Sequence, residues 1–191
     1  CYELFRKYNY EMDGGLDPRV MTTCEKVNKL LTKAYSSDSL AWPKDKMKYR
    51  AIIWSCPPHF YANFSNWLAN CWGIDVLVEM ESLNFTKPLE TEDKEEALRD
   101  LARLYERMVM RRHTNGGYQN VVDELWRQCE DWNAKLIIMY QNVACKNMAT
   151  VQGILDEQGR ERGLHMIWVE HDLMDPRTVS RSSMRAKVTE Y

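Results

Sequence analysis

Four short, continuously apolar runs alternate with helical stretches along this 191-residue chain. The runs occupy residues 51–56, 74–78, 135–140 and 165–169. Because they do not alternate between apolar and polar side chains, each is expected to be a strand buried on both faces, as in a parallel sheet. Strands separated by helices in this way predict an α/β fold. We expect a small doubly wound, flavodoxin-like sheet of four parallel strands flanked by helices.

The chain divides into two predicted parts at the start of the first strand. Residues 1–47 carry apolar side chains at roughly helical spacing and are predicted to form an N-terminal helical segment. Residues 48–191 are predicted to form the α/β domain that carries the functional site. Within it, one long helix is expected from Thr91 to about Arg112 and a second from about residue 118 to residue 132. The chain opens on Cys1 without an initiator methionine, so we interpret it as a piece of a longer protein.

Composition excludes several classes of protein. The net charge is −2 and the isoelectric point about 6.1, so there is no basic field of the kind that nucleic-acid binding requires. No apolar run approaches the roughly 18 residues of a membrane span, and no signal peptide pattern opens the chain. We therefore expect a cytoplasmic protein with neither a nucleic-acid nor a membrane partner. The turn after the first strand lacks the glycines of a dinucleotide-binding turn.

Cys145 is the sharpest candidate for chemistry. It follows the third strand and directly precedes a predicted helix. A helix N-terminus favours negative charge, so a thiolate forms there more easily than elsewhere. The thiol could be a nucleophile or a metal ligand, and a half-buried structural cysteine is an equally weighted alternative. The chain holds six cysteines without a CxxC pair, which we interpret as reduced thiols.

Other polar side chains stand at the carboxyl ends of the predicted strands, where sites of open α/β sheets are built. The possible edges of the site are Cys56, His59, Asn142, Lys146, Glu170, His171, Asp172 and Arg177. Glu79 ends the second strand in the same way. Cys56 is interpreted more simply as a small core residue. A triad of Cys145, His171 and Asp172 would imply acyl transfer, although the spacing alone does not show the geometry.

These motifs together resemble the subunits of the 2-hydroxyacyl-CoA dehydratase and benzoyl-CoA reductase family, and the 2-hydroxyglutaryl-CoA dehydratase D-component in particular. The carrying residues are Asn142-Val-Ala-Cys145-Lys146, then Val169-Glu-His-Asp172, then Asp175-Pro-Arg177. The preceding strand–helix–strand unit is similar as well, so the resemblance covers about residues 48–191. His171 departs from the family pattern, which more often has a small residue at that position.

The resemblance implies an oxygen-sensitive enzyme of anaerobic metabolism that dehydrates or reduces an acyl-CoA substrate through a radical. It implies a homologous second subunit, an ATP-dependent activator protein and a [4Fe–4S] cluster held by three cysteines in each subunit. The third of these cysteines maps onto Cys145, and thiolate ligation is the usual chemistry of such clusters. The first two belong to a preceding domain, and neither Cys1 nor Cys24 matches them. We therefore expect this piece by itself to lack the cluster and to be inactive.

Two alternatives remain open beside this assignment. The chain could be a structural or partner-binding subunit of the same family without a cluster. Outside the family, it could be a thiol-dependent hydrolase or acyl transferase that uses Cys145 and His171. Whether the reaction would be a dehydration or a ring reduction is also open.

Overall fold

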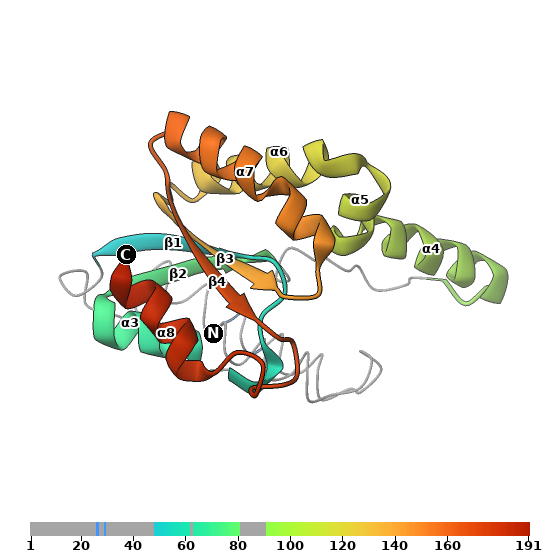
Figure 1. Ribbon diagram of the computed structural model, residues 1–191. Coiled ribbons are helices and arrows are strands. Elements are labelled where there is room, and N and C mark those ends of the chain that lie inside the picture. The colour runs from blue at the N-terminus through green and yellow to red at the C-terminus, as the bar shows by residue number, and fades with distance from the viewer. Residues whose placement is uncertain (1–25, 27–28, 30–47, 62, 81–90) are drawn as a thin grey trace. The chain divides into compact units, whose positions relative to one another are not determined.

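The computed structural model describes residues 26, 29, 48–61, 63–80 and 91–191 (Figure 1). The chain separates into two compact units, Cys1–Lys46 and Met47–Tyr191. In the first unit only Lys26 and Lys29 are described, and both are helical and exposed. The helical segment predicted over residues 1–47 otherwise lies outside the described residues, so it stays a prediction.

The second unit is built on a four-stranded parallel sheet, as predicted. Its strands are β1 (Tyr49–Trp54), β2 (Ile74–Glu79), β3 (Leu136–Asn142) and β4 (His165–His171). Their spatial order is β2-β1-β3-β4, with every neighbouring pair parallel. The doubly wound, flavodoxin-like expectation is therefore confirmed. The last two strands run two residues beyond their predicted ends, which carries polar side chains to the edge of the sheet.

Helices cover both faces of the sheet (Figure 1). One face carries α3 (Phe64–Trp72) and α8 (Arg181–Glu190). The other carries α6 (Gly117–Asp131) and α7 (Lys146–Glu161). A short 3₁₀ turn, η2 (His59–Tyr61), follows β1. Among the described residues no helix combines the length and apolar character needed to cross a bilayer.

The apolar runs are continuous because each strand contributes side chains to the hydrophobic cores on both faces of the sheet. Along β1, Ala51 and Ile53 pack under α3 and α8, whereas Ile52 and Trp54 pack under the helices of the opposite face. All four side chains are fully buried. In a strand with one face exposed to solvent, every second one of these residues would be polar. The sheet is thus the central layer of a three-layer domain.

The long helix predicted from Thr91 to Arg112 is two helices, α4 (Lys94–Arg107) and α5 (Val109–Asn115). Between them Met108 adopts an extended backbone, with φ −60° and ψ 141°. The start of α4 also lies three residues later than predicted, because Asp93 is its N-cap and accepts a hydrogen bond from the Glu96 amide at 2.8 Å. The break was not visible in the sequence because the apolar spacing continues through Met108.

Candidate functional site

The strand order places two loops beside one another at the carboxyl edge of the sheet. From β1 the chain turns to one side to form β2, and it later returns to the other side of β1 to form β3. The loops after β1 and β3 therefore lead to opposite faces of the sheet and diverge at this edge. Such a switch point is where open α/β sheets build their sites. Cys56 lies in the first loop and Cys145 in the second.

Asn142 fixes the turn that presents Cys145. Its side-chain oxygen accepts a hydrogen bond from the Ala144 amide at 2.8 Å. Its backbone carbonyl accepts one from the Cys145 amide, also at 2.8 Å. Asparagine favours such a turn because its side chain can bond to the backbone two residues on. The Asn-x-x-Cys sequence thus forms a local turn at which β3 ends and α7 begins.

Cys145 occupies the N-cap position of α7 without capping it. The residue has φ −88° and ψ 93°, and its side chain makes no cap hydrogen bond. Cysteine is not among the residues that cap helices well. The thiol is a free, half-buried group at the N-terminal end of a four-turn helix. Its sulfur caps no backbone group of α7, so a ligand would not have to displace such a hydrogen bond.

A cavity of about 210 Å³ lies beside this thiol. Four predicted site residues line it together, namely Asn142, Cys145, Lys146 and Glu170. Gln141, Val143 and Ala149 complete the lining and were not predicted. The sequence could have pointed to Gln141 because it precedes Asn142 at the end of β3. Val143 and Ala149 have no chemical signal of their own.

Cys56 lies close enough to Cys145 for the two thiols to interact. Both are free, half-buried and packed against the same core cluster under α6 and α7. Burial raises the pKa of the Cys56 thiol, and the charge of Cys145 raises it further. The interpretation of Cys56 as a simple core residue is therefore incomplete. It packs like one, but its thiol also lies near enough to Cys145 to feel that group's charge, although Cys56 does not line the cavity.

His171 ends β4 as a fully buried side chain. Its Nδ1 lies 3.0 Å from the carbonyl oxygen of Asp172, and its ring meets the edge of Tyr140 with centroids 5.3 Å apart. Because a carbonyl only accepts hydrogen bonds, Nδ1 carries the proton. Burial lowers the pKa of His171. Hydrogen bonds with the backbone of Asp172 and Cys56 partly offset this lowering. The imidazole is thus a neutral packing element behind the loops.

Asp172 does not orient His171 through its carboxylate. Its Oδ1 instead accepts hydrogen bonds from the amides of Met174 and Asp175, at 2.9 and 2.8 Å, and these bonds lower the pKa of Asp172. In a catalytic triad the carboxylate would bond to the imidazole N–H. The geometry therefore does not support the Cys145–His171–Asp172 triad.

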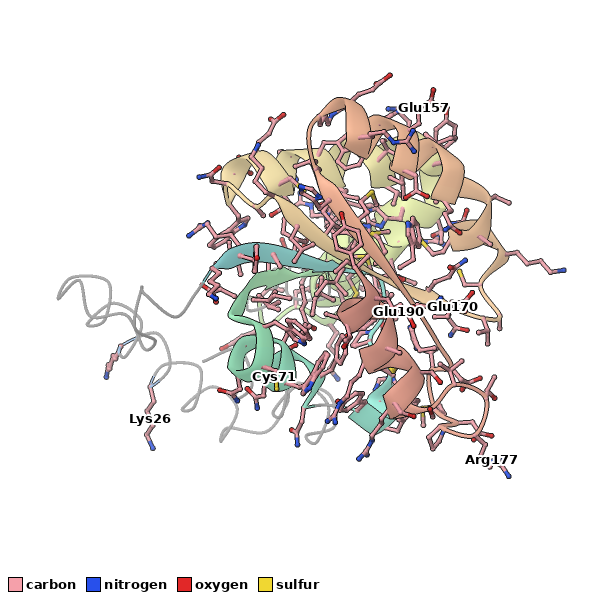
Figure 2. All side chains as sticks on the ribbon, turned by 60° about the vertical axis from the view of Figure 1, so that its left-hand side comes forward. Lys26, Cys71, Glu157, Glu170, Arg177 and Glu190 are labelled. Carbon is pink, nitrogen blue, oxygen red and sulfur yellow. The ribbon has the colours of Figure 1, made fainter. Side chains whose placement is uncertain are left out.

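Arg177 pairs with its own loop. Its guanidinium donates to Asp175 at 2.6 to 3.0 Å, and the side chain remains 88% exposed. The pairing lowers the pKa of Asp175 and raises the pKa of Arg177. Figure 2 shows Arg177 pointing outward from the tip of the β4–α8 loop. The Asp-Pro-Arg motif thus shapes the loop that leads to α8, and Arg177 does not line the cavity.

Backbone hydrogen bonds tie the three edge loops together. The Val143 amide donates to the His171 carbonyl at 2.9 Å, which joins the loops after β3 and β4. The His59 amide donates to the Leu173 carbonyl at 2.8 Å, which joins the loops after β1 and β4. His59 is therefore placed beside the β4 loop by its backbone, while its side chain is exposed.

Glu79 carries the most perturbed carboxyl group of the edge. It ends β2 at 1% exposure and accepts a hydrogen bond from the Ser65 hydroxyl at 3.2 Å. Burial raises its pKa to about 8, so the group is largely protonated at neutral pH. Its place at a strand end was predicted, but its burial was not, because burial depends on how β2 packs against other elements such as α3, which carries Ser65.

A second polar cluster was missed in the sequence. Glu124 on α6 pairs with Arg112 at 2.9 Å, with His113 at 3.0 Å and with Arg127 at 3.4 Å. Burial lowers the pKa of His113, and the hydrogen bond that His113 donates to Glu124 partly offsets this lowering. The cluster borders an open, polar depression formed by α4, α5 and α6. None of its lining residues comes from the carboxyl edge of the sheet.

A known protein family matches most of this chain, including the candidate site. The family model described as 2-hydroxyglutaryl-CoA dehydratase, D-component, matches residues 16–191. The chain belongs to this family. The match takes in the whole α/β unit, including the Asn142–Cys145 turn and the β4–α8 loop. No curated protein matches the chain at a significant level.

A subunit of the 2-hydroxyglutaryl-CoA dehydratase D-component family would be expected to offer thiolates to an iron–sulfur cluster, which needs three or four of them. The described residues contain no group of three or more His, Cys, Asp or Glu side chains that could hold a metal ion. Cys145 has the right donor atom, an open position and no competing hydrogen bond. The described residues therefore fit one ligand of a cluster and do not form a complete site.

Proposed function

We propose that this chain is the part of an iron–sulfur subunit that supplies the Cys145 ligand in a 2-hydroxyacyl-CoA dehydratase or benzoyl-CoA reductase type of enzyme. The observation that carries the proposal is the Asx turn at Asn142, which holds a free thiol at the start of α7 beside a cavity. Membership of the dehydratase family supports it. The remaining ligands would come from residues outside the described part or from another chain.

Four of the residues around the cavity have a role in this proposal. Cys145 binds the metal as a thiolate, and the N-terminus of α7 favours its negative charge. Asn142 orients Cys145 through the turn. Lys146 brings a cation to the same cavity, which suits an anionic substrate group or an anionic cluster, and Glu170 brings a carboxylate that can accept or release a proton.

A bound cluster would supply one-electron transfer at low potential to an acyl-CoA substrate. We further propose that a homologous subunit and an ATP-dependent activator complete the enzyme. The family resemblance supports the partners and the cluster, and a cytoplasmic location is proposed with them.

Anaerobic reconstitution of the complete protein with iron and sulfide tests the proposal. The readouts are the iron and sulfide content per subunit and the electron paramagnetic resonance spectrum after reduction. We expect Cys145→Ala to lose most of the cluster, because a cluster with one ligand fewer is open to water and oxygen. Cys71→Ala is the matched control, since Cys71 is an exposed free thiol on α3 (Figure 2).

Unchanged cluster content in Cys145→Ala would overturn the assignment. A protein that binds no cluster in any form would favour the second candidate function, a structural or partner-binding subunit of the same family. The lack of a ligand group of three or more among the described residues is the observation that favours this candidate.

A further inference from the structure

Cys56 and Cys145 form a pair at one edge of the sheet. The described part of the chain holds four free cysteines, Cys56, Cys71, Cys129 and Cys145. Cys71 and Cys129 lie near the ends of α3 and α6, and these helices lead back into the amino ends of β2 and β3. Cys56 and Cys145 instead follow the carboxyl ends of β1 and β3. The topology therefore separates this pair from the other two thiols.

The two loops that carry the pair leave the sheet side by side. β1 and β3 are neighbouring parallel strands, and Trp54 is aligned with Met139 near their carboxyl ends. Neighbouring strands lie about 4.8 Å apart. A disulfide joins Cα atoms that are roughly 4.4–6.8 Å apart. The loops after β1 and β3 thus start at a spacing that a disulfide can span.

Both thiols pack on the same face of the sheet. They contact the core cluster that α6 and α7 cover, although the chain after Cys56 continues toward the opposite face to form α3. Ser55, directly before Cys56, has a φ of 75°, a backbone conformation that residues other than glycine rarely adopt. Such a conformation persists only where the surrounding structure fixes it. The placement of Cys56 on the same face as Cys145 is therefore set by the fold.

The two thiols differ in access. Cys145 lines the 210 Å³ cavity at the start of α7, whereas Cys56 does not. A small reagent in the cavity therefore meets Cys145 first. Redox-sensing cysteines are typically accessible and stand next to a second thiol that resolves the first product. Cys145 has the position of the attacking thiol, and Cys56 has that of the resolving thiol.

The electrostatics of the pair suit this order of events. Burial raises the pKa of the Cys56 thiol, and the charge of Cys145 raises it further. Cys56 thus holds its proton while Cys145 is a thiolate. Once the Cys145 sulfur is part of a neutral disulfide, the charge of Cys145 is gone, and Cys56 releases its proton more easily.

We propose that Cys56 and Cys145 are a redox-active thiol pair that closes to a disulfide by exchange with a small disulfide such as oxidised glutathione. The Cys145 thiolate attacks one sulfur of oxidised glutathione, which forms a mixed disulfide and releases one glutathione thiolate. The Cys56 thiolate then attacks the Cys145 sulfur, and the second glutathione leaves as a thiolate. Two protein thiols lose two electrons and two protons, and these reduce one glutathione disulfide to two thiols.

The bridge would take Cys145 out of use as a metal ligand until a reductant reopens it. This consequence rests on the proposed function. The exchange itself does not, because it needs only the two thiols and the small disulfide.

Incubation of the whole reduced chain with oxidised glutathione, without iron and without oxygen, tests the proposal. Remaining thiols are then alkylated, and digestion with chymotrypsin, which separates Cys56 from Cys71, precedes mass spectrometry. Wild type should yield the Cys56–Cys145 disulfide as the main product. Cys56→Ser should instead accumulate glutathione on Cys145, because no second thiol displaces it. Cys56→Ala should behave in the same way, which excludes an effect of the serine hydroxyl.

Cys71→Ser is the matched control, because it removes an exposed thiol on α3 and should form the same disulfide as wild type. Circular dichroism checks that each variant keeps the fold. Wild type that retains as much glutathione on Cys145 as Cys56→Ser overturns the proposal. A Cys145 that does not react, or that pairs with another cysteine, also overturns it. Because no iron is present, these results are separate from the outcome of cluster reconstitution.

Discussion

Glu79 makes the stability of the domain depend on pH. The carboxyl group is 1% exposed at the end of β2, where it accepts a hydrogen bond from Ser65, and burial raises its pKa to about 8 from an ordinary value of 4.5. In the unfolded chain it ionises near its ordinary pKa. In the folded chain it must ionise in a site that disfavours charge. We predict that Glu79→Gln, which keeps the shape and an acceptor for Ser65, removes this penalty.

The sign of the effect follows from the two pKa values. Below pH 4.5 both states are protonated and the penalty is absent. Between pH 4.5 and about 8 the unfolded chain releases the proton while the folded chain keeps it, so the free energy of unfolding falls as the pH rises. Each unit of pKa difference corresponds to ~1.4 kcal/mol, which sets an upper limit of about 5 kcal/mol for the full penalty. Relaxation of the site and entry of water reduce it to a few kcal/mol.

Urea unfolding of wild type and Glu79→Gln, followed by circular dichroism at a series of pH values from about 5 to 9, measures the effect. The two proteins should have similar stability at the acidic end. The variant should be more stable by a few kcal/mol at the alkaline end. Glu157→Gln is the control, because it removes an exposed carboxylate and should run parallel to wild type. If Glu79→Gln also runs parallel to wild type, the buried carboxyl is not protonated as described.

Three further substitutions test single contacts. Asn142→Ala removes the acceptor of the Ala144 amide, so we expect a loss of ~1 kcal/mol of stability and faster hydrogen exchange at that amide. Glu124→Ala strands buried His113 without its partner, and thermal unfolding should show a loss of about 2–3 kcal/mol, with a smaller loss in Glu124→Gln. Leu155→Ala opens a cavity at a fully buried position under the sheet, and chemical unfolding should show a loss of ~2–5 kcal/mol. If Asn142→Ala is as stable as wild type, the hydrogen bond with the Ala144 amide does not stabilise the domain. If Leu155→Ala is as stable as wild type, the burial of Leu155 does not stabilise it.

The part of the site that could be predicted is the part that local sequence determines. The Asn142–Cys145 turn and the helix after it are specified within four residues, because the asparagine side chain bonds to its own backbone and the strand must end there. The same is true of the Asp175–Arg177 turn. The sequence predicts the first motif at the end of the third strand and the second as a turn before the last helix, and the structure has both there. The role of Arg177 was left open because exposure depends on the surrounding loops.

The sequence by itself determined the class of fold, since strands such as β1 that are apolar on both faces can be buried only in a central parallel sheet. Tertiary structure decided which distant residues meet. It brought Cys56 beside Cys145 by setting β1 and β3 next to each other, buried Glu79 at the end of β2 beside Ser65 of α3, and turned the Asp172 carboxylate into its own loop instead of toward His171. These outcomes depend on strand order and on packing between remote segments, which the pattern of any single segment does not contain.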